Sequence, residues 1–343
     1  VAAIRAAQLG ADVTVIEKCH VGGTCLNEGC IPTKALLHSA EVYENAKNGA
    51  DIGVIAQPVL DFTKVMERKN AVVKRLVDGI HALLKANGVN IIEGEGSFAD
   101  RTTVKVKTAD GERKIISDKY IIATGSVPST VPIKGIDSPQ CIDSTGALSL
   151  EKCPESMVVI GGGVIGVEMA TAYSSFGTKV TIVEMLPRLL MNMDEDMTAV
   201  AVKAIEKNGA EIMTSTKVVS VDDMGEKAVV TVEKDGVQEQ IEAEKVLVCI
   251  GRIPNTDSLN LEAAGIECER RAIKVNDYME TNVRNIYAIG DCTGGTMLAH
   301  VASAQGEKAA ENAMGNDSRY DSKTNPSCVY TNPEMASVGY TDR

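Results

Sequence analysis

The chain has 343 residues, enough for two or three domains, and a net charge of −12 at pH 7. This charge argues against nucleic acid or an anionic membrane as a partner, since both favour basic surfaces. No apolar run reaches the ~18 residues of a membrane span, and nine cysteines are too few for a secreted disulfide scaffold. We therefore expect a cytoplasmic protein.

The first predicted element, over residues 8–17, is the end of a helix followed by a glycine cap and a strand. Its sequence QLGADVTVIE resembles SFGTKVTIVE at residues 175–184, so that Glu17 and Glu184 lie 167 residues apart at equivalent places. Each copy is typical of a buried parallel strand that ends in an acid. The chain therefore contains an internal repeat.

Two cysteines five residues apart, Cys25 and Cys30, form the next motif. They can close a small ring if the backbone brings their Cα atoms within about 7 Å, and a tight exposed disulfide favours exchange chemistry. Pro32 fits the first turn of a helix, so we expect the pair at a helix start, where the dipole favours a thiolate. A structural disulfide, two buried thiols or a zinc site remain alternatives, although His20, the only close extra ligand, is wrongly spaced for zinc.

The other cysteines have no spacing pattern and are interpreted as inert buried thiols. They are Cys19, Cys141, Cys153, Cys249, Cys268, Cys292 and Cys328.

A helix without obvious catalytic side chains is predicted over residues 61–86 from its periodicity. A buried strand that ends in a glycine turn follows at residues 120–126, and residues 246–252 are its counterpart in the second copy of the repeat. A linker is predicted after each of these strands. The residues that mark the linkers are Pro128, Pro132, Pro254 and Asn255.

The second copy of the repeat begins with a complete dinucleotide-binding fingerprint. A predicted strand at residues 157–160 is followed by GGGVIG at residues 161–166 and then by a helix. These glycines give a tight turn and admit a pyrophosphate to the helix N-terminus. Glu184 follows Gly166 by eighteen residues, about where a ribose-binding acid belongs.

In the first copy the equivalent glycines would precede Val1. We therefore expect the chain to begin inside the first helix of a second dinucleotide-binding unit, with Glu17 as its ribose acid. The sequence is typical of a protein that binds two dinucleotides and that is truncated here. Without that glycine loop we expect weak binding of the first dinucleotide.

Three further features complete the chain. Residues 228–243 alternate in polarity around Asp235-Gly236, which predicts a hairpin. Residues 285–291 predict a strand that ends in Gly-Asp, and Asp291 is interpreted either as a ligand of a polyol chain or as a turn-forming residue. A new segment opens at Asn325.

Together, the motif at residues 25–34, the fingerprint and the Gly-Asp strand resemble the flavin-dependent pyridine nucleotide-disulfide oxidoreductases, over all 343 residues. Leu26 and Ile31 resemble the branch of this family that oxidises dihydrolipoamide with NAD, because glutathione and mercuric reductases usually carry Val there. Residues 297–300 (MLAH) also resemble the flavin-contacting segment of that branch.

The resemblance implies an α/β fold with two Rossmann-like dinucleotide-binding domains in three layers, one for FAD and one for NAD. The expected boundaries are residues 1–126 for the FAD-binding domain, without its N-terminal strand and glycine loop, and 127–254 for the NAD-binding domain. A central domain at 255–323 would complete the FAD site, and 324–343 would start a truncated α+β dimerisation domain.

The resemblance also implies roles for four catalytic residues. Cys30 would stack on the flavin in charge transfer, and Cys25 would exchange with the lipoyl dithiol. Lys34 lies one helical turn beyond Cys30, would reach the flavin and would pair with Glu168. The alternatives are a solvated surface lysine for Lys34 and a helix N-terminal acid for Glu168.

Candidate cofactor-binding residues follow from the same resemblance, and no metal site is implied. Those expected to bind FAD are Glu17, Lys18, Gly23, Thr24, Lys34, Gly96, Thr124, Gly125, Ser126, Asp291, Met297, Leu298, Ala299 and His300. Those expected to bind NAD are Gly161, Gly163, Val164, Ile165, Gly166, Glu168, Glu184, Val218 and Gly251.

The family's catalytic base is a His paired with a Glu near the C-terminus and donated by the partner subunit, and it has no counterpart among the four histidines here. We expect an enzyme that is a homodimer when complete. Its partner would be the lipoyl group of a 2-oxoacid dehydrogenase or of the glycine cleavage carrier protein. The alternatives are a catalytically silent NAD-binding fragment, or a related reductase of another disulfide or of a metal ion.

The expected nucleotide is NAD rather than NADP. The carboxylate of Glu184 suits ribose hydroxyls and repels a 2′-phosphate. Met185 and Met191 stand where NADP-dependent relatives place arginines, and Arg188 is the one cation nearby in the sequence.

Overall fold

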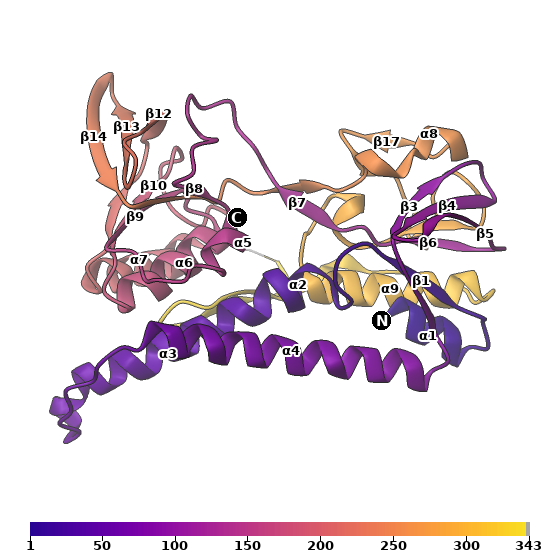
Figure 1. Ribbon diagram of the computed structural model, residues 1–343, viewed down its shortest axis with the longest axis horizontal. Helices are drawn as coiled ribbons and strands as arrows, with labels where there is room; N and C mark the ends of the chain where they lie inside the picture. The colour runs from indigo at the N-terminus through magenta and orange to yellow at the C-terminus, as the bar shows by residue number, and fades with distance from the viewer. Residues whose placement is uncertain (341–343) are drawn as a thin grey trace. The chain divides into compact units, whose positions relative to one another are not determined.

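The computed structural model describes residues 1–340, which form two compact units (Figure 1). The first unit comprises residues 1–27, 75–127 and 252–325, and the second comprises 28–74, 128–251 and the residues from Pro326 on. No helix among residues 1–340 combines the length and the hydrophobicity that crossing a bilayer requires.

The second unit is built on a five-stranded parallel sheet with the order β11-β10-β9-β15-β8. Its strands are β8 (Cys141–Ile142), β9 (Ser156–Ile160), β10 (Lys179–Val183), β11 (Glu211–Met213) and β15 (Lys245–Val248). The helices of this unit are α3 (Cys30–Asn48), α5 (Ser144–Ala147), α6 (Val164–Ser175) and α7 (Glu195–Lys207), with a 3₁₀ turn, η1, at Gly49–Ile52.

Alternate residues of the central strand face two different cores. In β9, Met157 and Val159 join the core beneath the helices, whereas Val158 and Ile160 join a core shared with an antiparallel sheet. That second sheet contains β12 (Lys217–Asp223), β13 (Ala228–Lys234) and β14 (Val237–Ala243). The predicted three-layer arrangement is therefore confirmed for this unit.

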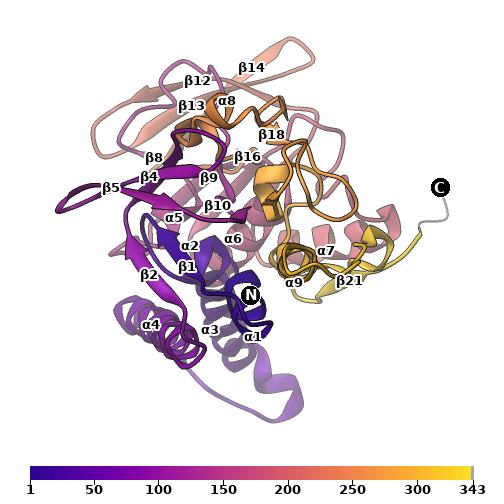
Figure 2. The ribbon, with the colours of Figure 1, turned by 90° about the vertical axis from the view of Figure 1, so that its right-hand side faces the viewer.

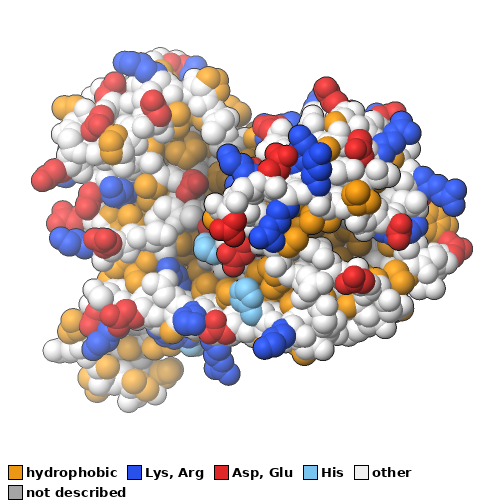
Figure 3. Space-filling model, turned by 45° about the vertical axis from the view of Figure 1, so that its right-hand side comes forward, with side chains coloured by type: hydrophobic (Ala, Val, Ile, Leu, Met, Phe, Trp, Pro, Cys, Tyr) orange, Lys and Arg blue, Asp and Glu red, His pale blue; other side chains and the backbone are white. Residues whose placement is uncertain are grey.

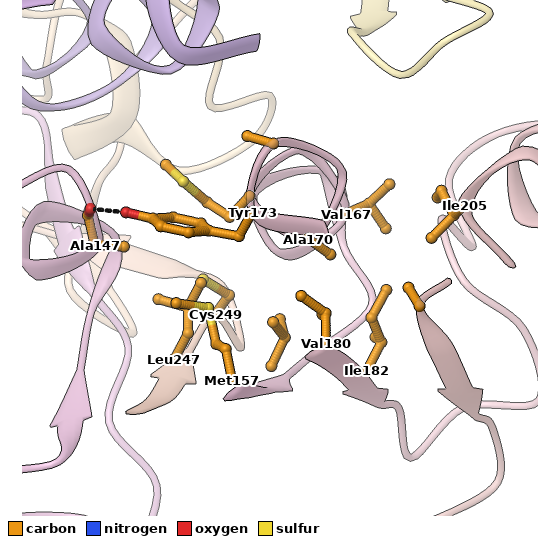
Figure 4. Packing of buried hydrophobic residues seen from close by; sticks show 14 of the residues in the cluster. Ala147, Met157, Val167, Ala170, Tyr173, Val180, Ile182, Ile205, Leu247 and Cys249 are labelled. Atoms are coloured by element: carbon orange, nitrogen blue, oxygen red, sulfur yellow. Dashed lines mark hydrogen bonds between the residues drawn. The ribbon is translucent and has the colours of Figure 1, made fainter. Parts of the chain in front are cut away.

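The helical side of the core is centred on Tyr173 of α6. Its ring is fully buried and its hydroxyl donates to the carbonyl oxygen of Ala147, as Figure 4 shows. The side chains of Met157, Val180 and Leu247, from three neighbouring strands, lie beneath the helix in the same view. Helix α3 packs on α6, so the segment that carries Cys30 and Lys34 is fixed to the fingerprint helix.

The first unit holds shorter sheets. The parallel pairs are β1 (Thr14–Glu17) with β2 (Asn90–Glu93), and β6 (Tyr120–Ile122) with β19 (Ile286–Ala288). An antiparallel sheet contains β3 (Glu95–Phe98), β4 (Thr103–Thr108) and β5 (Gly111–Ile116), and a small hairpin contains β17 (Cys268–Glu269) and β18 (Ala272–Ile273). Helix α1 (Ala2–Gln8) packs beside α9 (Ala299–Ala313), as Figures 1 and 2 show.

The remaining elements are short, apart from α4. They are α2 (Gly23–Glu28), α4 (Phe62–Ala86), α8 (Leu261–Ala264), β7 (Ser126–Pro128), β16 (Arg252–Pro254), β20 (Ser327–Val329), β21 (Met335–Ser337) and the 3₁₀ turns η2 (Asp257–Leu259), η3 (Gly290–Thr293) and η4 (Ser322–Thr324).

Most local predictions are confirmed. The helix expected at 61–86 is α4, and the predicted hairpin is β13–β14, whose turn residues Asp235 and Gly236 both have positive φ. One prediction is wrong in part. Strand β1 is only partly buried, because β2 is its one sheet neighbour among the described residues. The predicted linkers at Pro128 and Pro254 lie next to the points where the chain passes from one unit to the other, and they contain the short strands β7 and β16, which pair with each other.

Candidate active site

The two cysteines of the CLNEGC motif are joined by a disulfide. Cys30 is the first residue of α3, as predicted, whereas Cys25 lies in the separate short helix α2. Gly22 and Gly23, both with positive φ, turn the chain into α2. Both cysteines are half-buried. Since a disulfide has no thiolate to offer a metal, zinc ligation by the pair is excluded in this state.

The interpretation of the other cysteines as buried thiols is wrong for two of them. Cys19 follows the partly buried strand β1 and Cys268 lies in the two-residue strand β17, and both are exposed. Cys249 and Cys292 are buried, and burial raises the pKa of the Cys249 thiol to about 12. The half-buried ones are Cys141, Cys153 and Cys328.

One helical turn beyond Cys30, Lys34 forms a two-pronged ion pair with Glu168 of α6. The Lys34 Nζ atom lies 2.9 Å from Oε1 and 2.8 Å from Oε2 of Glu168. The Glu168 side chain is 4% exposed and that of Lys34 is 31% exposed. Glu168 is the fifth residue of α6 and lies beyond its first turn. The surface-lysine and helix N-terminal interpretations are therefore wrong.

The ion pair has a third member that the sequence did not indicate. The backbone N–H of Tyr330 donates to Oε1 of Glu168 at 3.0 Å, and the Lys34 Nζ atom lies 4.5 Å from the centre of the Tyr330 ring. A cation over a ring face is attracted by the ring quadrupole. Tyr330 therefore fixes both partners of the pair, from a segment 162 residues after Glu168 in the chain.

The fingerprint glycines have separate structural reasons. A Cβ on Gly161, where φ is +107°, would lie 2.4 Å from the carbonyl oxygen of Cys249, and one on Gly166 would lie 2.2 Å from that of Gly161. Gly163 caps the N-terminus of α6, and nothing lies within 4 Å of where its Cβ would stand. The glycines thus shape the turn and leave the helix N-terminus open to an anion.

The ribose acid lies beside this turn. Glu184 follows β10, the sheet neighbour of β9, and its carboxylate accepts hydrogen bonds from the N–H groups of Gly162 at 2.6 Å and Leu186 at 2.7 Å. Gly251 follows β15, on the other side of β9. The structure thus gathers these residues at the carboxyl ends of adjacent parallel strands, where such folds bind nucleotides. Val164 and Ile165 open α6, and Val218 lies in β12.

The residues predicted for FAD in the first unit also follow its strands. Glu17 ends β1 and accepts a hydrogen bond from the Cys19 N–H at 2.8 Å, which parallels Glu184 and Leu186 in the other unit. Asp291 follows β19 and accepts one from the Ser126 hydroxyl at 2.5 Å, and Arg252, which the sequence did not indicate, donates to that hydroxyl at 2.7 Å. The others are Lys18 after β1, Gly23 and Thr24 at the start of α2, Gly96 in β3, Thr124 and Gly125 after β6, Met297 and Leu298 just before α9, and Ala299 and His300 in its first turn.

Residues 1–306 match the family model described as pyridine nucleotide-disulphide oxidoreductase. The chain belongs to this family. A curated member of it, the dihydrolipoyl dehydrogenase of Geobacillus stearothermophilus, is 46% identical over 345 aligned residues, which cover 100% of this chain and 73% of that protein. The mitochondrial dihydrolipoyl dehydrogenase of Pisum sativum is 43% identical, over 100% of this chain and 70% of its own length.

Solved structures of the family agree with the fold. LpdA from Mycobacterium tuberculosis superposes with a TM-score of 0.91 at 29% identity, over 99% of this chain and 76% of its own. The HOCl-induced flavoprotein disulfide reductase RclA from Escherichia coli, solved as a Cu(II) complex, gives a TM-score of 0.89 at 31% identity, over 99% of this chain and 74% of its own. The predicted fold class, with two Rossmann-like domains, is therefore confirmed.

Proposed function

We propose that this chain is a dihydrolipoyl dehydrogenase that oxidises dihydrolipoamide with NAD through FAD and the Cys25–Cys30 disulfide. The observation that carries the proposal is the coincidence of three features on α3 and α6: a disulfide cysteine, a buried ion pair one turn away and an open dinucleotide turn. The relatives at 40–46% identity that bear this name support the choice of substrate.

The protein's own part in the reaction is thiol–disulfide exchange. A thiolate of dihydrolipoamide attacks the Cys25 sulfur, and the Cys30 thiolate leaves with the electron pair of the broken S–S bond. The second lipoyl thiolate then attacks the lipoyl sulfur of this mixed disulfide and releases the Cys25 thiolate. Two electrons have passed to the cysteine pair, and the two dithiol protons pass to solvent.

The residues present suit the ribose groups of both nucleotides. Glu17 and Glu184 end equivalent strands, and each carboxylate is oriented by a backbone N–H two residues further on, which suits the ribose hydroxyls of two dinucleotides. FAD, when bound, would relay the two electrons from the cysteine pair to NAD. Asp291 and the start of α9 would contact it in the first unit.

Lys34 provides the positive charge nearest in sequence to Cys30. Since Glu168 and Tyr330 hold its ammonium in place, Lys34 would stabilise the Cys30 thiolate and negative charge that develops on reduced flavin. Glu168 keeps the cation paired within the protein.

The lipoyl group would be carried by a 2-oxoacid dehydrogenase complex or by the glycine cleavage carrier protein.

On the face shown in Figure 3, acidic and basic side chains are interspersed, so this face is not the continuous basic surface that nucleic acid favours. The functional domain boundaries, the homodimer and the cytoplasmic location stay predictions.

The test is anaerobic incubation of the chain with dihydrolipoamide, followed by thiol alkylation and mass spectrometry. We expect two new thiols, at Cys25 and Cys30, and NADH formation at 340 nm when NAD and a large excess of FAD are added, because FAD binding is expected to be weak. Cys25→Ser and Cys30→Ser should both abolish NADH formation. The proposed substrate would be contradicted if glutathione reduced the disulfide as readily as dihydrolipoamide does and if dihydrolipoamide gave no NADH.

A further inference from the structure

The loop between β10 and α7, residues 184–194, contains an arginine that the proposed mechanism does not use. The Arg188 guanidinium donates to the carbonyl oxygen of Met193 at 3.0 Å, to those of Leu190 and Met191 at 3.3 Å each, and to the Thr198 hydroxyl at 3.4 Å. Its planar fork of N–H groups is therefore directed at the backbone of its own loop and at the first turns of α7.

The same loop is hydrogen-bonded to the fingerprint turn and packs against it. The N–H of Leu190 donates to the carbonyl oxygen of Gly162 at 2.9 Å, while the N–H of Gly162 donates to Glu184 at 2.6 Å. Leu189 is 1% exposed, and a Cβ on Gly162 would lie 2.3 Å from its Cδ2 atom. Both backbone polar groups of Gly162 are thus hydrogen-bonded, and the partner of its carbonyl oxygen, Leu190, lies in the loop that Arg188 stabilises.

Leu190 makes this contact from an unfavourable conformation. Its φ is +51°, in the left-handed region that leucine rarely adopts. Such a conformation persists only where the surroundings enforce it. The Arg188 hydrogen bond to the carbonyl oxygen of Leu190 itself, and those to the next residues, supply that enforcement.

We propose that Arg188 is a positioning residue for NAD, which presets the fingerprint turn by clamping the loop that holds Gly162. The proposal rests on the proposed function for the identity of the nucleotide. It differs from a direct role as a phosphate ligand, because the guanidinium already donates to four acceptors of the protein and its side chain is half-buried.

The test compares dissociation constants for NADH and NADPH, measured by calorimetry on the full chain and on Arg188→Ala, Arg188→Lys and the exposed control Arg113→Ala. We expect Arg188→Ala to weaken both nucleotides by the same factor, on the order of tenfold. Arg188→Lys should not restore binding, because an ammonium lacks the fork. An unchanged NADH affinity, a loss confined to NADPH, or full rescue by lysine would each overturn the clamp.

Hydrogen exchange of the nucleotide-free chain provides a second readout. In Arg188→Ala the amides of Leu190 and Gly162 should exchange faster, while those of β13 and β14 should not change. Uniformly faster exchange would indicate general destabilisation and overturn the proposal. If Arg188→Ala does not fold, Thr198→Val removes one acceptor of the guanidinium and should weaken NADH binding two- to threefold, and no change would overturn the clamp.

Failure of the clamp and failure of the proposed function have different signatures. A wild-type chain that binds NADH but does not oxidise dihydrolipoamide would reject the substrate and leave the clamp to be decided by the variants. A wild-type chain that binds neither nucleotide would overturn the clamp together with the nucleotide assignment.

Discussion

The ion pair between Lys34 and Glu168 should respond asymmetrically to loss of either partner. At 2.8 Å and an effective dielectric near 20, the two charges attract each other by about 6 kcal/mol before desolvation is subtracted. Removing one partner of a buried pair costs about 3–5 kcal/mol, because the other is left uncompensated. The side chain of Glu168 is 4% exposed and that of Lys34 is 31% exposed, so the carboxylate suffers more from isolation.

We therefore expect Lys34→Met to lower the free energy of unfolding by about 3 kcal/mol, since it leaves a buried carboxylate with the Tyr330 N–H. Glu168→Gln should cost roughly 1 kcal/mol, because the amide oxygen can still accept that hydrogen bond and the ammonium can be rehydrated. The double variant should be no less stable than Lys34→Met alone. Its loss of stability is then smaller than the sum of the two single losses, and this difference is a favourable coupling energy for the native pair.

The assay is urea unfolding at pH 7 without added flavin, followed by far-UV circular dichroism. Lys47→Ala is the matched control, because Lys47 pairs with Glu44 at 2.9 Å at the exposed end of the same helix and should change stability by less than about 0.5 kcal/mol. Equal losses for the two single variants, or a larger loss for Glu168→Gln, would refute the reasoning from burial.

Three further predictions concern other parts of the chain. Without denaturant, iodoacetamide should label Cys19 and leave Cys249 unmodified, since burial raises the pKa of the latter to about 12; mass spectrometry of the peptides checks this. The Ser318 hydroxyl first, and then Arg5, lower the pKa of Glu311 to about 2, so its contribution to stability is present above pH 4.5 and is lost as the pH falls through about 2. Glu311→Gln should therefore cost roughly 1 kcal/mol at pH 7, after solvent screening, and this cost should shrink as acid-unfolding curves pass through about pH 2. Steady-state kinetics should favour NAD over NADP more than tenfold, and Glu184→Ala combined with Met185→Arg should reduce that ratio; an unchanged ratio would reject Glu184 as the discriminating group.

The elements that the sequence predicts well are those with a local physical cause. The β13–β14 hairpin was predictable because Asp235-Gly236 supplies the two positive φ angles that a tight turn requires. The fingerprint turn was predictable because its glycines stand at a fixed spacing between a strand and a helix, although the atoms that a Cβ would meet at Gly161 and Gly162 belong to Cys249 and Leu189. Neither prediction needed any information about distant segments.

The exposure of individual residues was predicted less well, because it depends on how many strands pair with the strand that carries them. The two copies of the repeat have nearly the same pattern, but β10 lies inside a five-stranded sheet while β1 has one partner among the described residues. For this reason four of the five residues of β10 are buried and none of β1 is. Cys19, which follows β1, is exposed for the same reason, although cysteine is on average a buried residue.

The residues around Lys34 show where prediction from a chain stops. The position of Lys34 relative to Cys30 follows from helix geometry alone, since residues four apart share a face. Its pairing with Glu168 links positions 134 residues apart, so that only resemblance to a known family could suggest it. The hydrogen bond from Tyr330 to Glu168 could not be inferred from residue type, because the backbone N–H of Tyr330 makes it and not its side chain. Backbone donors carry no sequence signature, and the same holds for the carbonyl oxygens that Arg188 gathers. In this protein the charged groups of the site can therefore be predicted from the sequence, whereas several of the contacts that hold them in place cannot.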